Sequence, residues 1–436
     1  MRFKAAVGAW GAMGALLLAS GSASALEPLS DFVREAHRRN FDAREQAAVV
    51  AQRRDETSQA WWRLAPTITS SAAYTNNQYE AVVTIPLDQK GDVRTATITP
   101  QNQYDFTFTA SVPVIDVGAW ERIAAAKRTE GAALEQARST AFDVERNVAQ
   151  AYYQVVAAEA VLESAHKRRD TAKANLDYIK TRHDAGVASD LDLKRAASEF
   201  ERTNQDIADA DYQVKSTRRT LATVTGVEPS PGGVPLDADT RPEPPLAELE
   251  PDASALPSVR AAVENARAAD KNTEVTRAGL YPTVSATATE RITNATGFGQ
   301  SPYYLFGATA TWRWDLSVIP GTDAAARAAD AAHVRAERAR RQAQDTAYNA
   351  YQAVVQQIEK TRAASAEQDT SDLAVKLAHQ RYEAGTANYL DVLTAERDDF
   401  AAHVSLIQAA ADLAYARVSL RIATGHSIED GRGGVR

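Results

Sequence analysis

RHDAGVASDLD (182–192) and RYEAGTANYLD (381–391) are two versions of one segment, and this pair decides the architecture of the chain. Both carry Arg, Ala-Gly, Ala and Leu-Asp at the same places, 199 residues apart (381 minus 182). With that offset fixed and no gaps, 182–226 and 381–425 share 12 identities in 45 positions. The offset also aligns Ala151-Tyr152 with Ala350-Tyr351, and Asp116 with Asp315. One offset that holds over so long a span indicates a tandem duplication.

Each half predicts the same order of elements. A helix comes first, because no Pro or Gly occurs from 30 to 63. Two segments rich in Thr, Val and aromatic residues follow, at 64–75 and 103–116, and they alternate with the period of two that is typical of strands. The second half repeats this pair at 281–290 and 303–316. We expect two β-hairpins with long loops, at about 66–116 and about 281–316.

A very long helix is predicted after each hairpin, over 119–185 and 322–384. About 65 helical residues make a rod of roughly 100 Å. Each rod ends at Ala-Gly, where Gly186 and Gly385 suit the left-handed conformation that closes a helix. Returning helices are expected over 188–225 and 387–424. In the first rod, apolar residues recur at alternating spacings of three and four, which predicts a coiled-coil seam: Leu134, Ala137, Ala141, Val144, Val148, Ala151, Val155, Ala158, Leu162 and Ala165.

The remaining segments divide the chain. Residues 1–25 have a basic start, an apolar middle and a small-x-small end, as in a secretory signal peptide, with an uncleaved anchor as the alternative. The first repeat is then 26–226 and the second is 258–426. Residues 227–257 hold 8 of the 16 prolines, which predicts an irregular connector between the repeats. Residues 427–436 are expected to form a flexible tail.

Composition and motifs argue against several classes of function. Without residues 1–25 the net charge goes from −8 to −10, because two basic residues and no acidic residue are lost, and net acidity disfavours a nucleic-acid partner. The seven histidines form no ligand spacing, so we expect no metal site and no cofactor. No hydrolase motif, phosphate loop or dinucleotide fingerprint occurs, so the sequence predicts that the protein is not an enzyme.

The predicted strands point to a membrane and to an oligomer. Four strands per chain cannot close a barrel, for which about eight are needed, and open sheet edges are not tolerated in lipid. Several chains therefore have to pool their strands. The tryptophans outside the predicted signal peptide flank the hairpins, as amphipathic side chains do at bilayer interfaces: Trp61, Trp62, Trp120, Trp312 and Trp314. The alternative is that these rings pack a soluble sandwich, which leaves the long rods without a purpose.

Two repeats of helix, β-hairpin, long helix, turn and helix resemble the TolC family of outer-membrane efflux proteins, over nearly the whole chain. The most specific motifs are LAPT (64–67) and LYPT (280–283), which lead into the hairpins, and the turn RYEAGTANYLDVLTAE (381–396). The resemblance implies a mainly α protein in which three protomers share a 12-stranded β-barrel in the outer membrane and an α-barrel tunnel in the periplasm. It also implies two partners, a periplasmic adaptor protein and an inner-membrane pump.

Acidic residues after the two turns are the candidate gate. A ring of Asp192 or Asp391 side chains would repel itself and attract cations at a constriction. By resemblance, Asp391 matches the gate aspartate of the family, and Tyr382 and Asp192 match a pair that links neighbouring helical hairpins. The chain departs from the family pattern where a second gate acid falls at Thr394 and a basic residue falls at Ala387. The alternative is that both aspartates only cap helices, since the helix dipole favours acids there.

The turns themselves are the candidate docking sites. The resemblance implies that the turns at 185–188 and 384–387 form a rim that meets the adaptor, with Gly186, Val187, Gly385 and Thr386 exposed. The plain alternative is that the glycines only end helices. The leading prediction is a passive outer-membrane conduit of a tripartite efflux or type I secretion system, and the alternative is a periplasmic coiled-coil tether, which would need no amphipathic strands.

Overall fold

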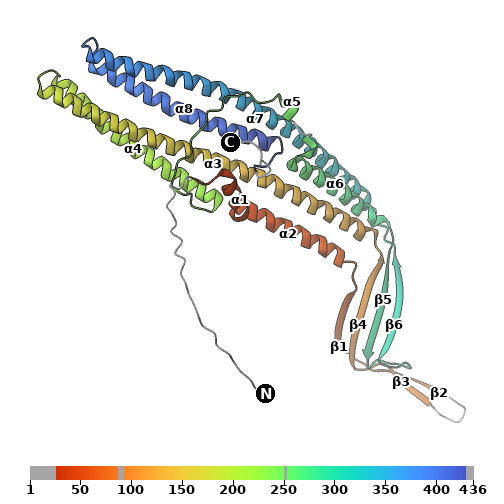
Figure 1. Cartoon of the computed structure of the whole chain (residues 1–436). Coiled ribbons are helices and arrows are strands. Elements are labelled where there is room, and N and C mark those ends of the chain that lie inside the picture. The colour runs from red at the N-terminus through yellow and green to blue at the C-terminus, as the bar shows by residue number, and fades with distance from the viewer. Residues whose placement is uncertain (1–25, 87–92, 250–252, 429–436) are drawn as a thin grey trace, which may run out of the picture.

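The computed structural model describes residues 26–86, 93–249 and 253–428, which form an elongated molecule with helices at one end and a sheet at the other (Figure 1). The predicted signal peptide, 1–25, lies outside the described residues. The helices are α1 (Leu29–Arg39), α2 (Phe41–Trp62), α3 (Val117–Asp184), α4 (Asp190–Thr225), α5 (Leu246–Leu249), α6 (Pro257–Arg277), α7 (Val318–Glu383) and α8 (Tyr389–Ala423). The strands are β1 (Thr67–Asn76), β2 (Ala81–Pro86), β3 (Val93–Thr99), β4 (Asn102–Ile115), β5 (Thr283–Thr293) and β6 (Tyr303–Thr311).

The two predicted hairpins are confirmed, and they join into one antiparallel sheet in the order β1-β4-β5-β6. Strand β1 pairs with β4 from Thr67 opposite Ser111 to Asn76 opposite Asn102. Strands β4 and β5 bring the two repeats together, with Thr109 opposite Thr289. Strands β1 and β5 run away from the helices, while β4 and β6 run back toward them (Figure 1). The duplicated sequence therefore builds one four-stranded unit from two halves.

A small second sheet, β2-β3, projects beyond the main sheet (Figure 1). The strands predicted at 64–75 and 103–116 leave only a long loop between them, so this second sheet is a finding of the structure. The alternation of Val, Thr and Ile over 81–86 and 93–99 is the same signal that identified the longer strands. This hairpin is held at its base by the loop between β5 and β6, where the Gly297 amide donates to the Thr97 carbonyl at 3.2 Å.

The first predicted helix is two helices rather than one. The backbone of Asn40 is extended, with φ −60° and ψ 139°, and its side chain accepts hydrogen bonds from the Asp42 and Ala43 amides. The same side chain donates to the Val224 carbonyl at 2.9 Å. An Asn that caps a new helix and bonds to a distant backbone group favours a break that the absence of Pro and Gly does not reveal.

The long helices α3 and α7 are confirmed, with 68 and 66 residues. Helix α7 begins four residues earlier than predicted, because Pro320 lies in its first turn, where the missing amide hydrogen is not needed. Each long helix turns into its return partner, α4 or α8. The two helical hairpins run side by side, and their tips lie at the end of the molecule opposite the sheet (Figure 1).

The predicted seam of α3 is buried through the middle of the helix. Val144, Val148 and Val155 are at most 1% exposed and pack with α1 and with Leu221 of α4. Leu134, predicted in the same seam, is 40% exposed. Close to Leu134, α3 instead forms ion pairs with α2, through Arg54 and Glu130, and with α6, through Arg128 and Glu264. Helices α6 and α7 pack through small residues, such as Ala266, Ala332 and Ala336, which allow close approach.

The connector and the chain end both bind to the helices. Arg417 of α8 donates to Asp239 at 2.8 Å and to the Arg241 carbonyl at 2.7 Å, so the irregular connector lies along α8. Ser427 and Ile428, at the start of the expected flexible tail, both donate to the Glu145 carboxylate at 2.8 Å. Residues 429–436 lie outside the described part. Among the described helices, none has the length and apolarity needed to cross a membrane.

Candidate functional site

The four-stranded sheet has one apolar face. Residues directly opposite in an antiparallel sheet point to the same side, so the register assigns each side chain to a face. In β4, Tyr104, Phe106 and Phe108 share a face and are 45–49% exposed. Their partners on this face are Ile68, Ser70, Ala72 and Tyr74 in β1, Ala286, Ala288, Glu290 and Ile292 in β5, and Tyr304, Phe306, Ala308 and Ala310 in β6.

Glu290 is the one carboxylate in that set. It lies opposite Phe108 and Tyr304, toward the end of the sheet that is far from the helices. A charged side chain on the lipid face of a barrel is least costly near the interface. The position of Glu290 therefore fits a membrane boundary at the level of Tyr304.

The opposite face of the sheet is polar. Thr107 and Thr109 of β4 lie beside Arg291 and Thr289 of β5, and the two threonine hydroxyls Thr109 and Thr289 are 3.2 Å apart. The Arg291 guanidinium pairs with Asp105, with Nε 2.7 Å from Oδ1. An ion pair and a row of hydroxyls suit a surface in contact with water.

Tryptophan and tyrosine side chains gather at the two ends of this sheet. Trp61 and Trp62 end α2, and Trp312 and Trp314 follow β6, so all four lie where the sheet meets the helices. The rings of Trp312 and Trp314 stack with centroids 4.8 Å apart, and Trp312 Nε1 donates to the Leu280 carbonyl at 3.0 Å. Tyr74, Tyr104, Tyr303 and Tyr304 lie at the other end. Two aromatic belts with an apolar band between them form the pattern of a membrane-spanning sheet.

The sheet is open at both edges. Strands β1 and β6 each have a neighbour on one side only within the described residues, and every residue of both strands is exposed. A row of unpaired backbone groups costs several kcal/mol per group in lipid. Because β6 runs toward the helices and β1 runs away from them, β6 of one copy can pair antiparallel with β1 of the next.

The first helical turn, at the opposite end of the molecule, places Asp192 at a helix N-terminus. Ser189 caps α4 by accepting a hydrogen bond from the Asp192 amide at 3.1 Å, and its hydroxyl donates to the Asp192 carboxylate at 2.7 Å. Arg195 lies 3.8 Å from the same carboxylate. Nearby, hydrogen bonding to Asp190 raises the pKa of His183. Asp192 thus takes part in a cap, and its carboxylate is half-buried.

At the second turn, which leads into α8, Asn388 and Asp391 cap the helix by exchanging two hydrogen bonds. The Asn388 side chain accepts from the Asp391 amide, and the Asp391 carboxylate accepts from the Asn388 amide, both at 3.1 Å. The two hydrogen bonds form a capping box. Asp391 remains exposed, so the cap leaves its charge in contact with solvent. The geometry supplies a structural role for both candidate gate aspartates and leaves the charge of Asp391 available for a second one.

Tyr382 lies in an apolar cluster that joins the two hairpins. Its ring is 5.6 Å from that of Tyr389 and lies under the Arg182 guanidinium at 5.4 Å. Burial raises the pKa of Tyr382, and the charge of Asp192 raises it further while that of Arg182 opposes the shift. The members of the cluster that are at most 3% exposed come from three of the four long helices: Ile179, Ala196, Tyr389, Val392 and Leu393. Tyr382 and Asp192 are thus neighbours within one chain.

The other predicted residues are exposed. The Thr394 hydroxyl donates to the Leu390 carbonyl one turn earlier in α8, at 2.9 Å. Gly186 and Gly385 have φ of +76° and +73°, and no atom lies within 4 Å of where a Cβ would be. Val187 is 65% exposed, and Thr386 donates its amide to the Arg381 carbonyl. The four turn residues form an open rim.

A buried ion-pair cluster that no sequence motif indicates lies beside the tips. Glu199 of α4 is 3% exposed and accepts hydrogen bonds from Arg168 of α3 at 2.6 Å and from Arg397 of α8 at 2.9 Å. Arg168 also binds Asp206 at 2.6 Å. Close by, Asn175 of α3 donates to Glu396 of α8 at 2.7 Å. These contacts tie the first helical hairpin to the second, and their residues are too far apart in sequence, and too different between the repeats, to leave a motif.

The electrostatics of the cluster favour its charged form. Burial opposes ionisation of Glu199, but the hydrogen bonds and charges of Arg397 and Arg168 outweigh it and hold the pKa of that carboxyl below its usual value. In the part of the chain that the structure describes, no group of three His, Cys, Asp or Glu side chains is placed to hold a metal ion. The contacts of Glu199 therefore stabilise the packing of the first helical hairpin against the second.

Two kinds of comparison with known proteins agree with this geometry. The sequence profile described as "Outer membrane efflux protein" matches residues 32–227 and 254–426. The toluene efflux pump outer membrane protein TtgF of Pseudomonas putida is 27% identical over 318 residues, which are 69% of this chain. OprJ of Pseudomonas aeruginosa is 24% identical over 68% of this chain. The chain spans 65% of the length of TtgF and 64% of OprJ.

Solved structures show the same fold. The open state of the MtrE outer membrane channel of Neisseria gonorrhoeae superposes with a TM-score of 0.73 at 21% identity, over 92% of this chain and 90% of that one. The VceC outer membrane protein of Vibrio cholerae gives 0.72 at 15% identity, over 92% and 97%. At these identities the likeness is one of fold, and it covers both the sheet and the long helices.

Proposed function

This chain belongs to the outer membrane efflux protein family, and from that premise we propose that it is the channel subunit of an efflux or secretion system. The observation that carries the proposal is the amphipathic four-stranded sheet with two open edges, mounted on helices about 100 Å long. Such a sheet enters lipid only as part of a closed barrel.

The proposed assembly is a homotrimer. The directions of β1 and β6 allow copies to join edge to edge without reversing any strand, so every complete ring has a multiple of four strands. Three copies give twelve strands, the number that the family resemblance implies. In this barrel the apolar face of Phe106 and Phe306 meets lipid, and the face of Thr109 and Arg291 lines the pore. The long helices below would then enclose a tunnel.

The proposed partners meet the protein at the helical tips. The exposed rim of Gly186, Val187, Gly385 and Thr386 would contact a periplasmic adaptor, which connects the channel to an inner-membrane pump. The name of TtgF assigns that relative to a toluene efflux pump. We propose the corresponding role here as a passive conduit that catalyses no reaction. The amphipathic sheet also argues against the alternative of a periplasmic tether.

Reconstitution tests this proposal. Purified full-length protein in planar lipid bilayers should give stepwise ion conductance, and the same preparation should run as an oligomer in detergent that dissociates only on heating. A protein that stays monomeric and soluble without detergent, and that leaves the bilayer insulating, would refute the channel. A periplasmic coiled-coil tether would give this monomeric, soluble and non-conducting result.

A further inference from the structure

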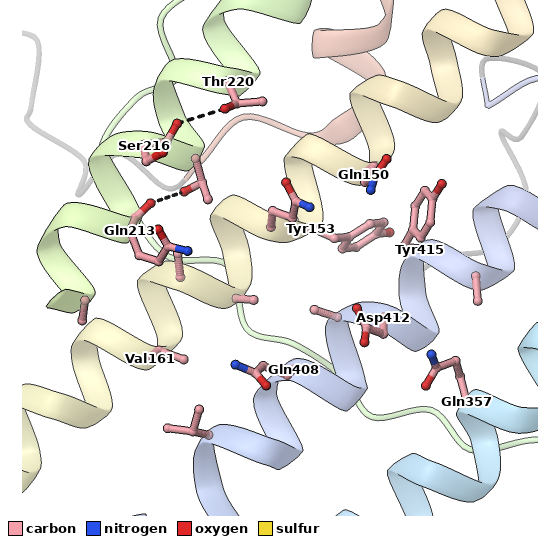
Figure 2. A pocket seen from close by; sticks show the side chains of 18 of the residues that line it. Gln150, Tyr153, Val161, Gln213, Ser216, Thr220, Gln357, Gln408, Asp412 and Tyr415 are labelled. Carbon is pink, nitrogen blue, oxygen red and sulfur yellow. Dashed lines mark hydrogen bonds between the residues drawn. The ribbon is translucent and has the colours of Figure 1, made fainter. Parts of the chain in front are cut away.

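A recess of about 910 Å³ lies in the layer formed by α3, α4, α7 and α8, about midway along the helices. Its volume is in the range of small-molecule sites. Figure 2 shows Tyr153 of α3 and Tyr415 of α8 pointing into the space between these two helices, with Asp412 and Gln357 on the side of α7. Helix α1 and the connector pass behind this layer in the view (Figure 2).

Small residues explain why the helices leave this space. Ala157 and Ala158 of α3, Ala353 of α7, and Ala411 and Ala416 of α8 line the recess. Alanine side chains fill little of the distance between neighbouring helices, whereas on the reverse side the larger Val155, Val156 and Leu221 pack under α1. The recess is therefore a depression of aliphatic carbon, flanked by two tyrosine rings.

The charged side chains that line the recess are all acidic, and the guanidinium charge of Arg421 acts on Tyr153 from outside the lining. Three aspartates line it, namely Asp206, Asp209 and Asp412, and among the described lining residues there is no Lys, Arg or His. Arg168 pairs with Asp206 at 2.6 Å and covers the Phe400 ring at 4.5 Å, so these two side chains already have a cationic partner. Asp209 and Asp412 are exposed and form no ion pair with a described residue. Two unneutralised carboxylates beside aromatic rings favour a cation over an anion.

A buried amide adds a second polar feature. The side-chain oxygen of Gln357 is buried, lines the recess, and accepts no hydrogen bond from a described residue. Buried acceptors without a partner are rare in folded proteins, so an unfilled acceptor at the wall of a cavity favours a ligand with a donor group.

We propose that this recess binds a planar aromatic cation, with the ring between Tyr153 and Tyr415 and the positive charge beside Asp412. A hydrated metal ion would gain nothing from the alanine floor, and an aromatic anion would be repelled by Asp209 and Asp412. The recess lies on the face of the helices opposite to α1 and the connector. In the proposed channel this face would line the tunnel, so the opening of the recess into the tunnel rests on the proposed function. Binding itself does not depend on conduction.

Ethidium, a fluorescent planar aromatic cation, is the probe. Its fluorescence anisotropy would be titrated with the full-length protein in detergent, against protein-free micelles. We expect saturable binding that weakens about fivefold to tenfold in Asp412→Asn and similarly in Tyr415→Ala, as one charge contact or one cation–π contact is lost. Fluorescein, a planar aromatic anion, should not bind.

Asp398→Asn is the matched control. Asp398 is an exposed aspartate on the same helix, α8, and it does not line the recess. Its variant should change ethidium affinity by less than about twofold, because at about 20 Å along the helix it lies beyond the screening length in physiological salt. Each variant should first run as the intact oligomer in detergent.

Three results would overturn the proposal. They are no saturable ethidium binding by the wild type, equal binding of fluorescein, or an equal loss of affinity in Asp398→Asn and Asp412→Asn. Conductance of the same samples separates the two proposals. A wild type that conducts without binding ethidium overturns only the recess, and one that binds ethidium but never conducts overturns only the channel.

Discussion

The two ends of this molecule differ in how far one chain completes them. At the sheet end, all residues of the edge strands β1 and β6 are exposed, and the apolar side chains of a whole face have no cover. At the helical tips, Tyr389, Val392 and Leu393 are at most 3% exposed, and both turns are capped by their own side chains. In the proposed channel the sheet is completed by other copies of the chain and by lipid, whereas the tips are closed by contacts within the chain.

That difference bears on how the proposed channel could open. A barrel in lipid cannot lose an edge pairing without exposing backbone groups to hydrocarbon, so the sheet has to stay closed. The tips are held by the cluster around Glu199, by the tyrosine cluster, by the Ser189 cap of α4 and by the capping box of α8, and each of these contacts can be removed by a single substitution. Opening at the tips is therefore the movement that the contacts allow.

The first prediction concerns the apolar face of the sheet. Ala288→Arg places a charge among Ala110 and Phe306 on that face and should destabilise the inserted barrel by about 2–4 kcal/mol per copy. The fraction of heat-resistant oligomer in the membrane should fall sharply. Thr289→Arg, one residue later on the polar face, is the matched control and should still assemble. Equal loss of assembly in both variants would contradict the assignment of the two faces.

The second prediction concerns the cluster that joins the helical hairpins. Arg397→Ala removes one of the two arginines that bind the buried Glu199 carboxylate, and it should weaken the tie by about 1.5–3 kcal/mol. Hydrogen exchange of the amides in 190–200 and 389–399 should become faster, while the sheet stays protected. Arg202→Ala, an exposed arginine of α4, should leave both regions unchanged. Unaltered exchange in Arg397→Ala would show that the cluster does not hold the tips together.

The same cluster should respond to pH in a defined direction. Because the pKa of Glu199 is lowered in the folded chain, its stabilising contribution is present above about pH 4.5 and is lost as the pH falls below that value. Exchange of the amides around Glu199, corrected for intrinsic rates, should therefore accelerate as the pH falls below about 4.5. Arg397→Ala should reduce this acceleration. An identical pH profile in the variant would exclude Glu199 as its origin.

The next prediction concerns the left-handed backbone conformation of the turn glycines. Gly385→Ala forces a side chain into a left-handed conformation in an otherwise open space, so its cost should be conformational only, at about 1–2 kcal/mol. Hydrogen exchange of residues 381–391 reports this local loosening. Gly233→Ala, which also meets no atom within 4 Å and has no positive φ, should be neutral. No difference between the two variants would mean that the turn adapts without strain.

The smallest expected effect separates the two roles of Asp391. Asp391→Ala removes both the charge and the capping box, and should cost about 1 kcal/mol at the start of α8 while raising single-channel conductance or weakening block by divalent cations. Asp391→Asn keeps an acceptor for the Asn388 amide, so it should weaken the block without loosening the helix. Unchanged conductance and block in both variants would leave Asp391 with the capping role alone.

Much of the fold was predictable from the sequence, because its signals are local or repeated. The 199-residue offset, the period-two strands and the uninterrupted helices α3 and α7 predict the order of elements and the pairing of the hairpins. The break at Asn40 was not predictable, because it depends on a hydrogen bond to Val224, which lies 184 residues away. The β2-β3 hairpin carried a usable signal in its Val and Thr alternation.

The sequence indicated where the candidate site residues lie in the fold, but not which side chains from other helices surround them. The sequence and the family resemblance indicate Asp192, Asp391 and Tyr382, and the structure places all three at the tips with their caps and ring contacts. Glu199, Arg168 and Arg397 meet only because two hairpins pack together, and neither repeat carries a matching set. The recess at Tyr153 and Tyr415 likewise comes from four helices at once.

Disulfide cross-linking between β1 and β6 of neighbouring copies would test whether three chains share one closed sheet. The chain has no cysteine, so Thr69→Cys in β1 can be combined in turn with Leu305→Cys, Gly307→Cys or Thr309→Cys on the polar face of β6, with each single variant as a control. We expect at least one pair to oxidise in membranes and to give covalent products of up to three chains and no more. Only monomers for every pair, or a ladder that continues beyond three, would contradict a closed sheet shared by three chains.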